Sequence, residues 1–346
     1  MMTIEELYKF IDKKWFVIDL KENKIGHIKI ALVREVVNPL IIRSTDSEAT
    51  ITYRTTDGRE IVEIPPRKLK SREKLLGLML CREFSVVDEK VRYNVFEGAE
   101  MLNNPNSALF GDTSTKSGDT AGLTSRVIYD WSYSLRDIKD ITDKLQHNAL
   151  SESGTMIDET TGEMRQSLYS TEYILQGTFF PHFITVDNIT PELFIHLLSC
   201  IINQQRYGAQ TTTNANNIIN HLVAIGFADF EKPINSYIIS KEWDKNKIPD
   251  KTEVENFINQ KMEAHYTESG LVKKPDKLVE WVNELWKEKD KASLKEIYVS
   301  AKKSVDSYLK NIKMVKEPGA GKKQKGAKKE ERSIAEDSDE NTSPED

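Results

Sequence analysis

The stretch that decides the fold is a strand followed at once by a helix, TFFPHFITVDNITPELFIHLLSCII, residues 178–202. Its first ten residues are rich in β-branched and aromatic side chains, which favour a strand. Thr190 is a good helix N-cap and Pro191 suits the first helical position. Further strands are predicted over 27–37, 40–64, 125–134 and 221–227. We therefore predict an α+β fold.

The composition excludes a membrane protein and a wholly disordered one. Of 346 residues, 38% are hydrophobic and 30% are charged. The longest apolar stretch, 193–202, is half of the roughly 20 residues that a membrane helix needs. Glu5 and Glu6 lie where a signal peptide carries positive charge. Cys81 and Cys200 suit neither a disulfide framework nor a zinc site, so we expect a cytoplasmic protein without a membrane partner.

Other parts of the chain differ in composition from the predicted strands. The polar segment 103–124 is predicted to be a mobile functional loop. The segment 148–169, with glycines and an Asp-Glu-Thr-Thr-Gly turn, is predicted to be a protruding hairpin. Helices are predicted over 254–262, 275–286 and 292–314. The chain beyond residue 315, a Gly-Lys run followed by an acidic run, is predicted to be disordered.

A basic segment is hidden by the net charge of −6. Residues 67–82 carry six cations against one anion, Glu73. We predict a helix over 71–82, capped by Ser71, with a basic outer face. Its apolar face is expected to consist of Leu75, Leu76, Met79 and Leu80. This segment can bind a polyanion, although a solvated helix face remains an open alternative.

The loop after the long helix, QQRYGAQTTTNANN at 204–217, combines a cation, a ring, a glycine and many amides and hydroxyls. Gly208 can let a phosphate approach backbone N–H groups while Arg206 neutralises it and the polar side chains contact ribose. The alternative is an Asn-capped turn that ends the helix. The pattern favours a nucleic-acid backbone grip.

Familiar enzyme motifs are missing. The six histidines form neither HExxH nor HxH. The run from Gly319 to Lys322 fails as a phosphate-binding loop because Lys316 occupies the place of the required glycine. We therefore predict no cofactor and no metal site.

Four stretches, in this order, resemble the RNA-binding backbone subunits of CRISPR effector complexes. They are LFGD at 109–112, LTSRVIYD at 123–130, EYILQGTFF at 172–180 and QRYGAQTTTN at 205–214. These subunits form the Cas-seven group of the repeat-associated RNA-binding (RAMP) superfamily. The runs at 130–137, 148–156 and 165–169 are similar to its type I-D branch. The resemblance covers about residues 25 to 240.

The resemblance implies a hand-shaped protein. Residues 1–240 would form an RRM/ferredoxin-like palm with an inserted finger (about 85–124) and a β-hairpin thumb (about 146–172). A helical region (241–315) and a disordered charged tail (316–346) would follow. Such subunits bind guide crRNA by phosphates and sugars, line up as copies in a helical filament with other type I-D subunits, and leave bases free to pair with target DNA in antiviral defence.

The resemblance also carries functional positions over to this chain. The palm grip falls on Arg43, Ser44, Thr45, Arg67, Lys68, Lys70, Arg72 and Lys74. The glycine-loop grip falls on Arg206, Tyr207, Gly208, Ala209, Gln210, Thr211, Thr212 and Asn214. The thumb falls on 148–169, with Asn148, Met156, Ile157, Arg165 and Tyr169, and Met156 or Ile157 would press between bases.

Two other functions stay open. Related subunits of another branch cleave target strands with a carboxylate, and Asp46 lies near the matching place without a convincing motif. Cleavage at regular intervals would then require Mg²⁺, the only cofactor considered. The second alternative is a structural scaffold that binds no RNA and whose basic helix contacts an acidic neighbour.

Overall fold

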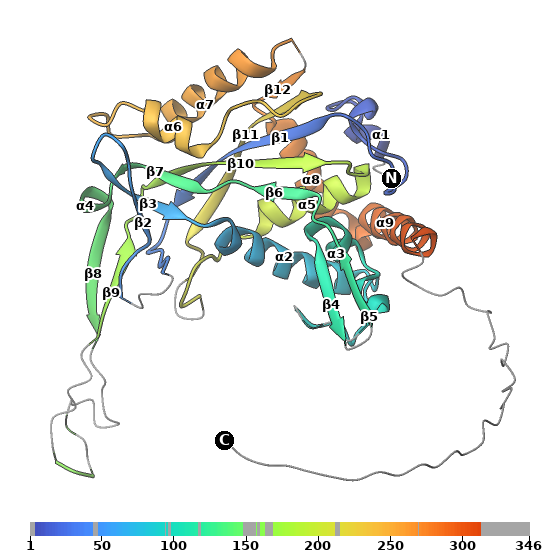
Figure 1. The fold of residues 1–346 in the computed structure, drawn as a ribbon, viewed down its shortest axis with the longest axis horizontal. Coiled ribbons are helices and arrows are strands. Elements are labelled where there is room, and N and C mark those ends of the chain that lie inside the picture. The colour runs from blue at the N-terminus through green and yellow to red at the C-terminus, as the bar shows by residue number, and fades with distance from the viewer. Residues whose placement is uncertain are drawn as a thin grey trace, which may run out of the picture. The chain divides into compact units, whose positions relative to one another are not determined.

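The computed structural model describes most of the chain up to residue 312 (Figure 1). The described residues are 4–43, 48–93, 95, 98–116, 119–147, 157, 160–162, 169–211, 215–268 and 270–312. Met1–Val315 forms one compact unit. The predicted combination of antiparallel sheets with helices is confirmed.

The centre of the unit is a five-stranded antiparallel sheet with the order β12-β11-β1-β10-β6. Its strands are β1 (His27–Val36), β6 (Val127–Tyr129), β10 (Phe179–Asp187), β11 (Ile218–Ala228) and β12 (Leu271–Lys273). The central strand β1 pairs with β10 on one side and β11 on the other. The strands predicted over 27–37, 178–187 and 221–227 are confirmed.

Helices cover both faces of this sheet, so alternate residues of β1 enter two separate cores. Ile30 and Leu32 pack into the core beside α2 (Pro66–Glu83) and α5 (Pro191–Asn203). Ala31 and Val33 pack into the core beside α6 (Ser236–Glu242) and α7 (Lys251–Tyr266). Figure 1 shows α6 and α7 on the opposite side of the sheet from α2 and α5.

The helix α5 begins where the sequence predicts. Thr190 is its N-cap, and its side chain accepts a hydrogen bond from the Leu193 N–H. The helix α2 departs from the prediction, because it begins at Pro66 rather than at Ser71. Proline is favoured at the first helical position, where its missing N–H costs no helical hydrogen bond.

The buried face of α2 also differs from the prediction. Leu69, Leu78 and Cys81 are buried, whereas Met79 is 56% exposed. Of the four apolar residues that were expected to form the core face, Leu80 alone packs against the core. The helix therefore turns a different stripe toward the core.

The segment predicted to be a mobile functional loop, 103–124, has regular secondary structure over most of its described residues. It contains a helix and a two-stranded hairpin, α3 (Pro105–Phe110), β4 (Asp112–Lys116) and β5 (Asp119–Leu123). The single strand predicted over 125–134 is likewise wrong. Two strands replace it: β6 belongs to the central sheet, whereas β7 (Ser132–Asp137) joins β2 (Thr52–Arg54) and β3 (Glu60–Ile64) in a separate three-stranded sheet.

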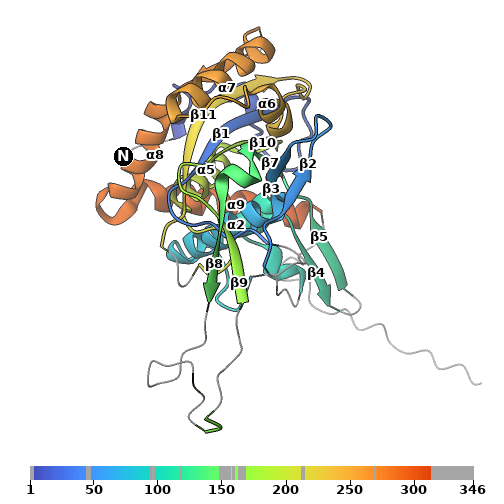
Figure 2. The same ribbon diagram turned by 90° about the vertical axis from the view of Figure 1, so that its left-hand side faces the viewer.

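The predicted protruding hairpin begins with two paired strands, β8 (Thr142–His147) and β9 (Tyr169–Ile174). Thr142 pairs with Ile174 at the base, and His147 pairs with Tyr169 at the far end. Figure 2 shows this pair of strands running away from the body of the unit. Most of its tip lies outside the described residues.

The three predicted C-terminal helices are present as α7, α8 (Asp276–Lys287) and α9 (Ala292–Asn311). Leu278 and Leu285 of α8, and Leu294 of α9, join the core beside α5. Short elements complete the described chain: α1 (Ile4–Leu7), α4 (Ile138–Ile141), and the 3₁₀ helices η1 (Lys13–Trp15), η2 (Ala99–Leu102) and η3 (Lys289–Lys291). Within the described residues, no helix has the length and apolar character needed to cross a bilayer.

Candidate nucleic-acid interface

The helix α2 and the loop that follows α5 line one groove. Its volume is about 760 Å³. Arg72 on α2 and Arg206 in the loop both line it. The other lining residues are Leu75, Leu76, Met79, Asn203, Gln204, Gln205, Thr211, Ala215 and Asn216. The two basic segments that the sequence singled out are therefore joined by one continuous depression.

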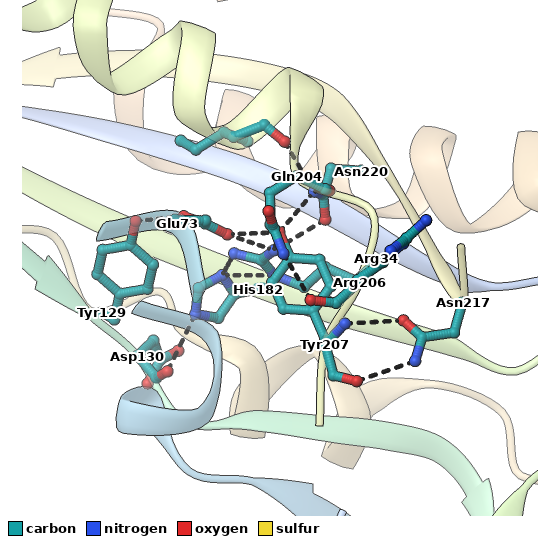
Figure 3. A network of polar contacts seen from close by, with 11 residues as sticks. Arg34, Glu73, Tyr129, Asp130, His182, Gln204, Arg206, Tyr207, Asn217 and Asn220 are labelled. Carbon is teal, nitrogen blue, oxygen red and sulfur yellow. Dashed lines mark hydrogen bonds and ion pairs between the residues drawn. The ribbon is translucent and has the colours of Figure 1, made fainter. Parts of the chain in front are cut away.

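A buried polar network connects the two segments (Figure 3). Arg34 of β1 and Glu73 of α2 are fully buried, and their Nη1 and Oε1 atoms lie 2.8 Å apart. The Tyr207 hydroxyl donates to the same carboxylate oxygen at 2.8 Å, and the Tyr129 hydroxyl donates to the other. A buried ion pair is tolerated only when further hydrogen bonds satisfy its atoms. Glu73 and Tyr207 each adjoin a groove arginine in sequence, so the network positions both arginines.

The charges in this network are well defined. Burial opposes the charged form of Arg34, but the Glu73 carboxylate together with Tyr207 and Tyr129 outweighs this and raises the pKa of the guanidinium. Burial, together with the charge of Arg34, holds the pKa of His182 well below its usual range. The imidazole is therefore neutral: its Nδ1 accepts from Arg34 Nε at 3.2 Å, and its Nε2 donates to the Asp130 carbonyl at 3.0 Å.

Two asparagines hold the start of the loop. Asn217 pairs with the backbone N–H and C=O of Tyr207, both at 2.9 Å. Asn220 donates to the Tyr207 hydroxyl and to the carbonyls of Ile201 and Gln204 at 2.8, 2.8 and 3.0 Å. Tyr207 is fully buried. Its side chain therefore supports the loop from inside and presents no surface to a ligand, unlike the RNA contact that was expected.

Gly208 is required by a close backbone approach. Its φ is +72°, and a Cβ at this position would lie 2.2 Å from the carbonyl oxygen of Ile41. The Ala209 N–H donates to that oxygen at 2.9 Å, and Arg72 Nη2 donates to the Gly208 carbonyl at 2.8 Å. The Ala209 N–H is therefore engaged within the protein. The glycine serves to seat the loop against the segment after β1.

A cluster of cations surrounds the start of α2. Burial lowers the pKa of Lys68, and the positive charges of Arg67, Arg43 and Arg72 lower it further. Such mutual repulsion shows that these four side chains share one region. Counter-charge from a polyanion would relieve it.

Lys70 and Lys74, by contrast, are used inside the fold. Lys70 Nζ donates to Ser125 Oγ at 2.6 Å and to the Val127 carbonyl at 3.0 Å. Burial lowers the pKa of Lys70 to about 8. Lys74 is buried in an ion pair with Asp112 and also donates to the Gly111 carbonyl at 2.9 Å. The outer face of α2 is thus less basic than the sequence suggests.

Several predicted positions lie outside the described residues. They are Ser44, Thr45, Asp46, Asn148, Met156, Arg165, Thr212 and Asn214. Of the other thumb positions, Ile157 is 48% exposed, and Tyr169 opens β9. Among the described residues, no three His, Cys, Asp or Glu side chains form a group that could hold a metal ion.

The part that α2 plays in the groove was not predicted from the sequence. Leu75, Leu76 and Met79 were assigned to the core, yet they line the groove with Arg72. The available signal was their spacing from Arg72, because positions i, i+3, i+4 and i+7 share one helix face. The buried partners Arg34 and Glu73 left no recognisable signal, since they lie on different elements.

The chain is similar to known proteins of one family. The Csc2 CRISPR family, described as "Csc2 Crispr", matches residues 19–317. The crystal structure of Thermofilum pendens Csc2 is similar, with a TM-score of 0.60 and 14% identity over 90% of this chain and 99% of that chain. No curated protein sequence matches the chain.

Two chains from structures described as "CRISPR RNA-guided surveillance complex", one of them "pre-nicking", have lower TM-scores of 0.44 and 0.45. They are 11% and 10% identical, over 69% of this chain and 84% and 89% of those chains. The family match, in contrast, spans most of the sequence, and the chain therefore belongs to the Csc2 CRISPR family.

Proposed function

We propose that this protein is the crRNA-binding backbone subunit of a type I-D CRISPR effector complex. The observation that carries the proposal is the single groove in which Arg72 and Arg206 meet, beside the cation cluster of Arg43, Arg67 and Lys68. Membership of the Csc2 CRISPR family supports the same assignment. Single-stranded nucleic acids are bound by positively charged grooves that follow their backbone.

The side chains in the groove suit binding that ignores base sequence. Arginine contacts phosphates, and exposed amides such as Gln205 and Asn216 can donate to or accept from ribose hydroxyls. These contacts position a strand but read no base edge. In this proposal, sequence recognition of target DNA is left to base pairing with the guide.

The topology supports a ferredoxin-like palm. If the elements inserted between them are set aside, the chain runs β1-α2-β6-β10-α5-β11, and the four strands lie in the order β11-β1-β10-β6. This is the βαββαβ arrangement of ferredoxin-like folds. The β4–β5 region would be the finger and the β8–β9 hairpin the thumb, and copies of the chain would assemble along one crRNA with other type I-D subunits in the cytoplasm.

Salt-dependent RNA binding tests the proposal. The affinity of the purified chain for single-stranded RNA of mixed sequence is measured over a series of salt concentrations. Each phosphate contact contributes about 0.7 to the slope of log affinity against log salt. Arg206→Ala is expected to reduce the slope by about that amount.

The matched control is Lys277→Ala on α8, which removes one exposed charge far along the chain from the groove. It is expected to leave the slope unchanged. Thermal melting of both variants checks folding, because neither side chain is buried. RNA binding that is absent, or equally weakened by both substitutions, would exclude a phosphate grip in this groove and favour the scaffold function.

A further inference from the structure

One wall of the groove is apolar. Arg72, Leu75, Leu76 and Met79 follow one another at helical spacing and all line it. Met79 is 56% exposed, and both leucines are partly exposed. The core face of α2 is made by other residues, so the fold itself does not require this apolar stripe.

The remaining groove residues are polar and come from the loop after α5. Gln205, Arg206 and Asn216 are exposed there. No hydrogen bond or ion pair from the Arg206 guanidinium to another described residue is present, whereas Arg72 donates to the Gly208 carbonyl. The groove thus offers hydrogen-bonding groups on the loop side and an uncharged apolar strip on the helix side.

We propose that the strip formed by Leu75, Leu76 and Met79 contacts the flat faces of guide-RNA bases while the loop holds the backbone. This inference rests on the proposed RNA-binding function. Every base has an apolar face, so contact with that face adds affinity without distinguishing the four bases. Methionine is flexible and polarisable and adapts to rings of different size.

Charge argues for a nucleic acid over a second protein as the occupant. The strip shares its groove with two arginines, and one of them, Arg72, belongs to the cluster that lowers the pKa of Lys68, which favours a polyanion. A strand whose phosphates face Arg206 has its bases on the other side of the sugar, where an apolar wall can cover them. Such base contact leaves the Watson–Crick edges uncovered.

A cycle that combines a protein variant with a modified RNA tests the proposal. Met79→Ala and the wild type are titrated with a mixed-sequence RNA and with the same RNA carrying abasic nucleotides at alternate positions. Met79→Ala is expected to weaken binding of the normal RNA about three- to tenfold, in line with the loss of a few methylene contacts. Base removal is expected to weaken binding to the wild type but to have little further effect on Met79→Ala.

The salt slope separates this proposal from the phosphate grip. Met79→Ala should leave the slope unchanged, because it removes no charge. Ile128→Ala is the matched control, since Ile128 is 52% exposed on β6 and outside the groove. Fully additive losses in the cycle, or an RNA-independent defect in self-association of Met79→Ala, would overturn base contact. Absence of RNA binding by the wild type would instead overturn the proposed function.

Discussion

Two pairs of neighbouring residues on the same elements behave in opposite ways. Arg72 lines the groove, whereas the next residue, Glu73, is fully buried against Arg34. Arg206 is exposed in the loop, whereas the next residue, Tyr207, is fully buried and hydrogen bonded to the same carboxylate. In each segment, adjacent residues therefore supply the surface that faces the ligand and its buried support, and the buried residue fixes the position of the exposed one.

The largest expected effect is on the buried side of this comparison. Glu73→Ala leaves the Arg34 charge without its partner in a water-free site and should lower the free energy of unfolding by about 3–5 kcal/mol. Urea unfolding measures the change. Glu6→Ala removes the carboxylate of the exposed Lys9–Glu6 pair and is expected to cost far less. Equal losses from the two substitutions would show that burial does not separate them.

The next effect depends on pH and involves Asp130 at the edge of the network. Burial raises the pKa of this carboxyl to about 6, although a hydrogen bond from the Ser236 N–H acts in the opposite direction. Because the folded pKa lies above the unfolded value, the folded state binds the proton more tightly. The contribution of Asp130 to stability therefore increases as the pH falls from 7 to 4, by about 3 kcal/mol at most.

Asp130→Asn keeps an oxygen that can accept from Ser236 and removes the titration. The stability difference between this variant and the wild type is measured at several pH values. Lys29 and Glu231, which influence the Asp130 carboxyl, are present in both proteins, so their own effects on stability largely cancel. The variant should be relatively more stable at pH 7 than at pH 4, and a difference that does not change with pH contradicts the assignment.

The smallest of the three effects concerns the contact between the loop at Gly208 and the Ile41 carbonyl. Gly208→Ala places a methyl group against the Ile41 carbonyl at a positive φ and should cost about 2 kcal/mol of stability. It should also weaken RNA binding, because the loop that carries Arg206 must shift. Gly177→Ala has a similar φ of +77° with no atom near the added methyl group. Thermal melting should show a larger loss for Gly208→Ala than for Gly177→Ala.

Local patterns in the sequence predict the framework well. The Thr190-Pro191 start of α5 and the strands β1 and β10 follow from capping and β-propensity, which act over a few residues. The predicted core face of α2 was wrong for a physical reason. Lys74 and Glu73 are buried because they form ion pairs with Asp112 and Arg34, which lie on distant segments. No local sequence pattern contains those partners.

In the candidate site, too, locally determined features were predicted and those that depend on distant residues were not. Arg206 and Gly208 were found because a cation and a glycine stand out in a polar loop. The role of Gly208 was not predictable, since it depends on Ile41, which is remote in sequence. Tyr207 looked like a ligand contact beside Arg206, but hydrogen bonds of its hydroxyl with Glu73, Arg34 and Asn220 hold its ring inside the protein.

The bonds of Lys70 have a consequence for crowding. The strand β6 is one border of the central sheet, and Lys70 and Ser125 both bond to the Val127 backbone on it. The other border, β12, is three residues long and ends in an exposed lysine. Unprotected sheet borders recruit foreign strands. Many identical molecules can therefore be held at high local concentration without aggregating by strand pairing between their sheet borders.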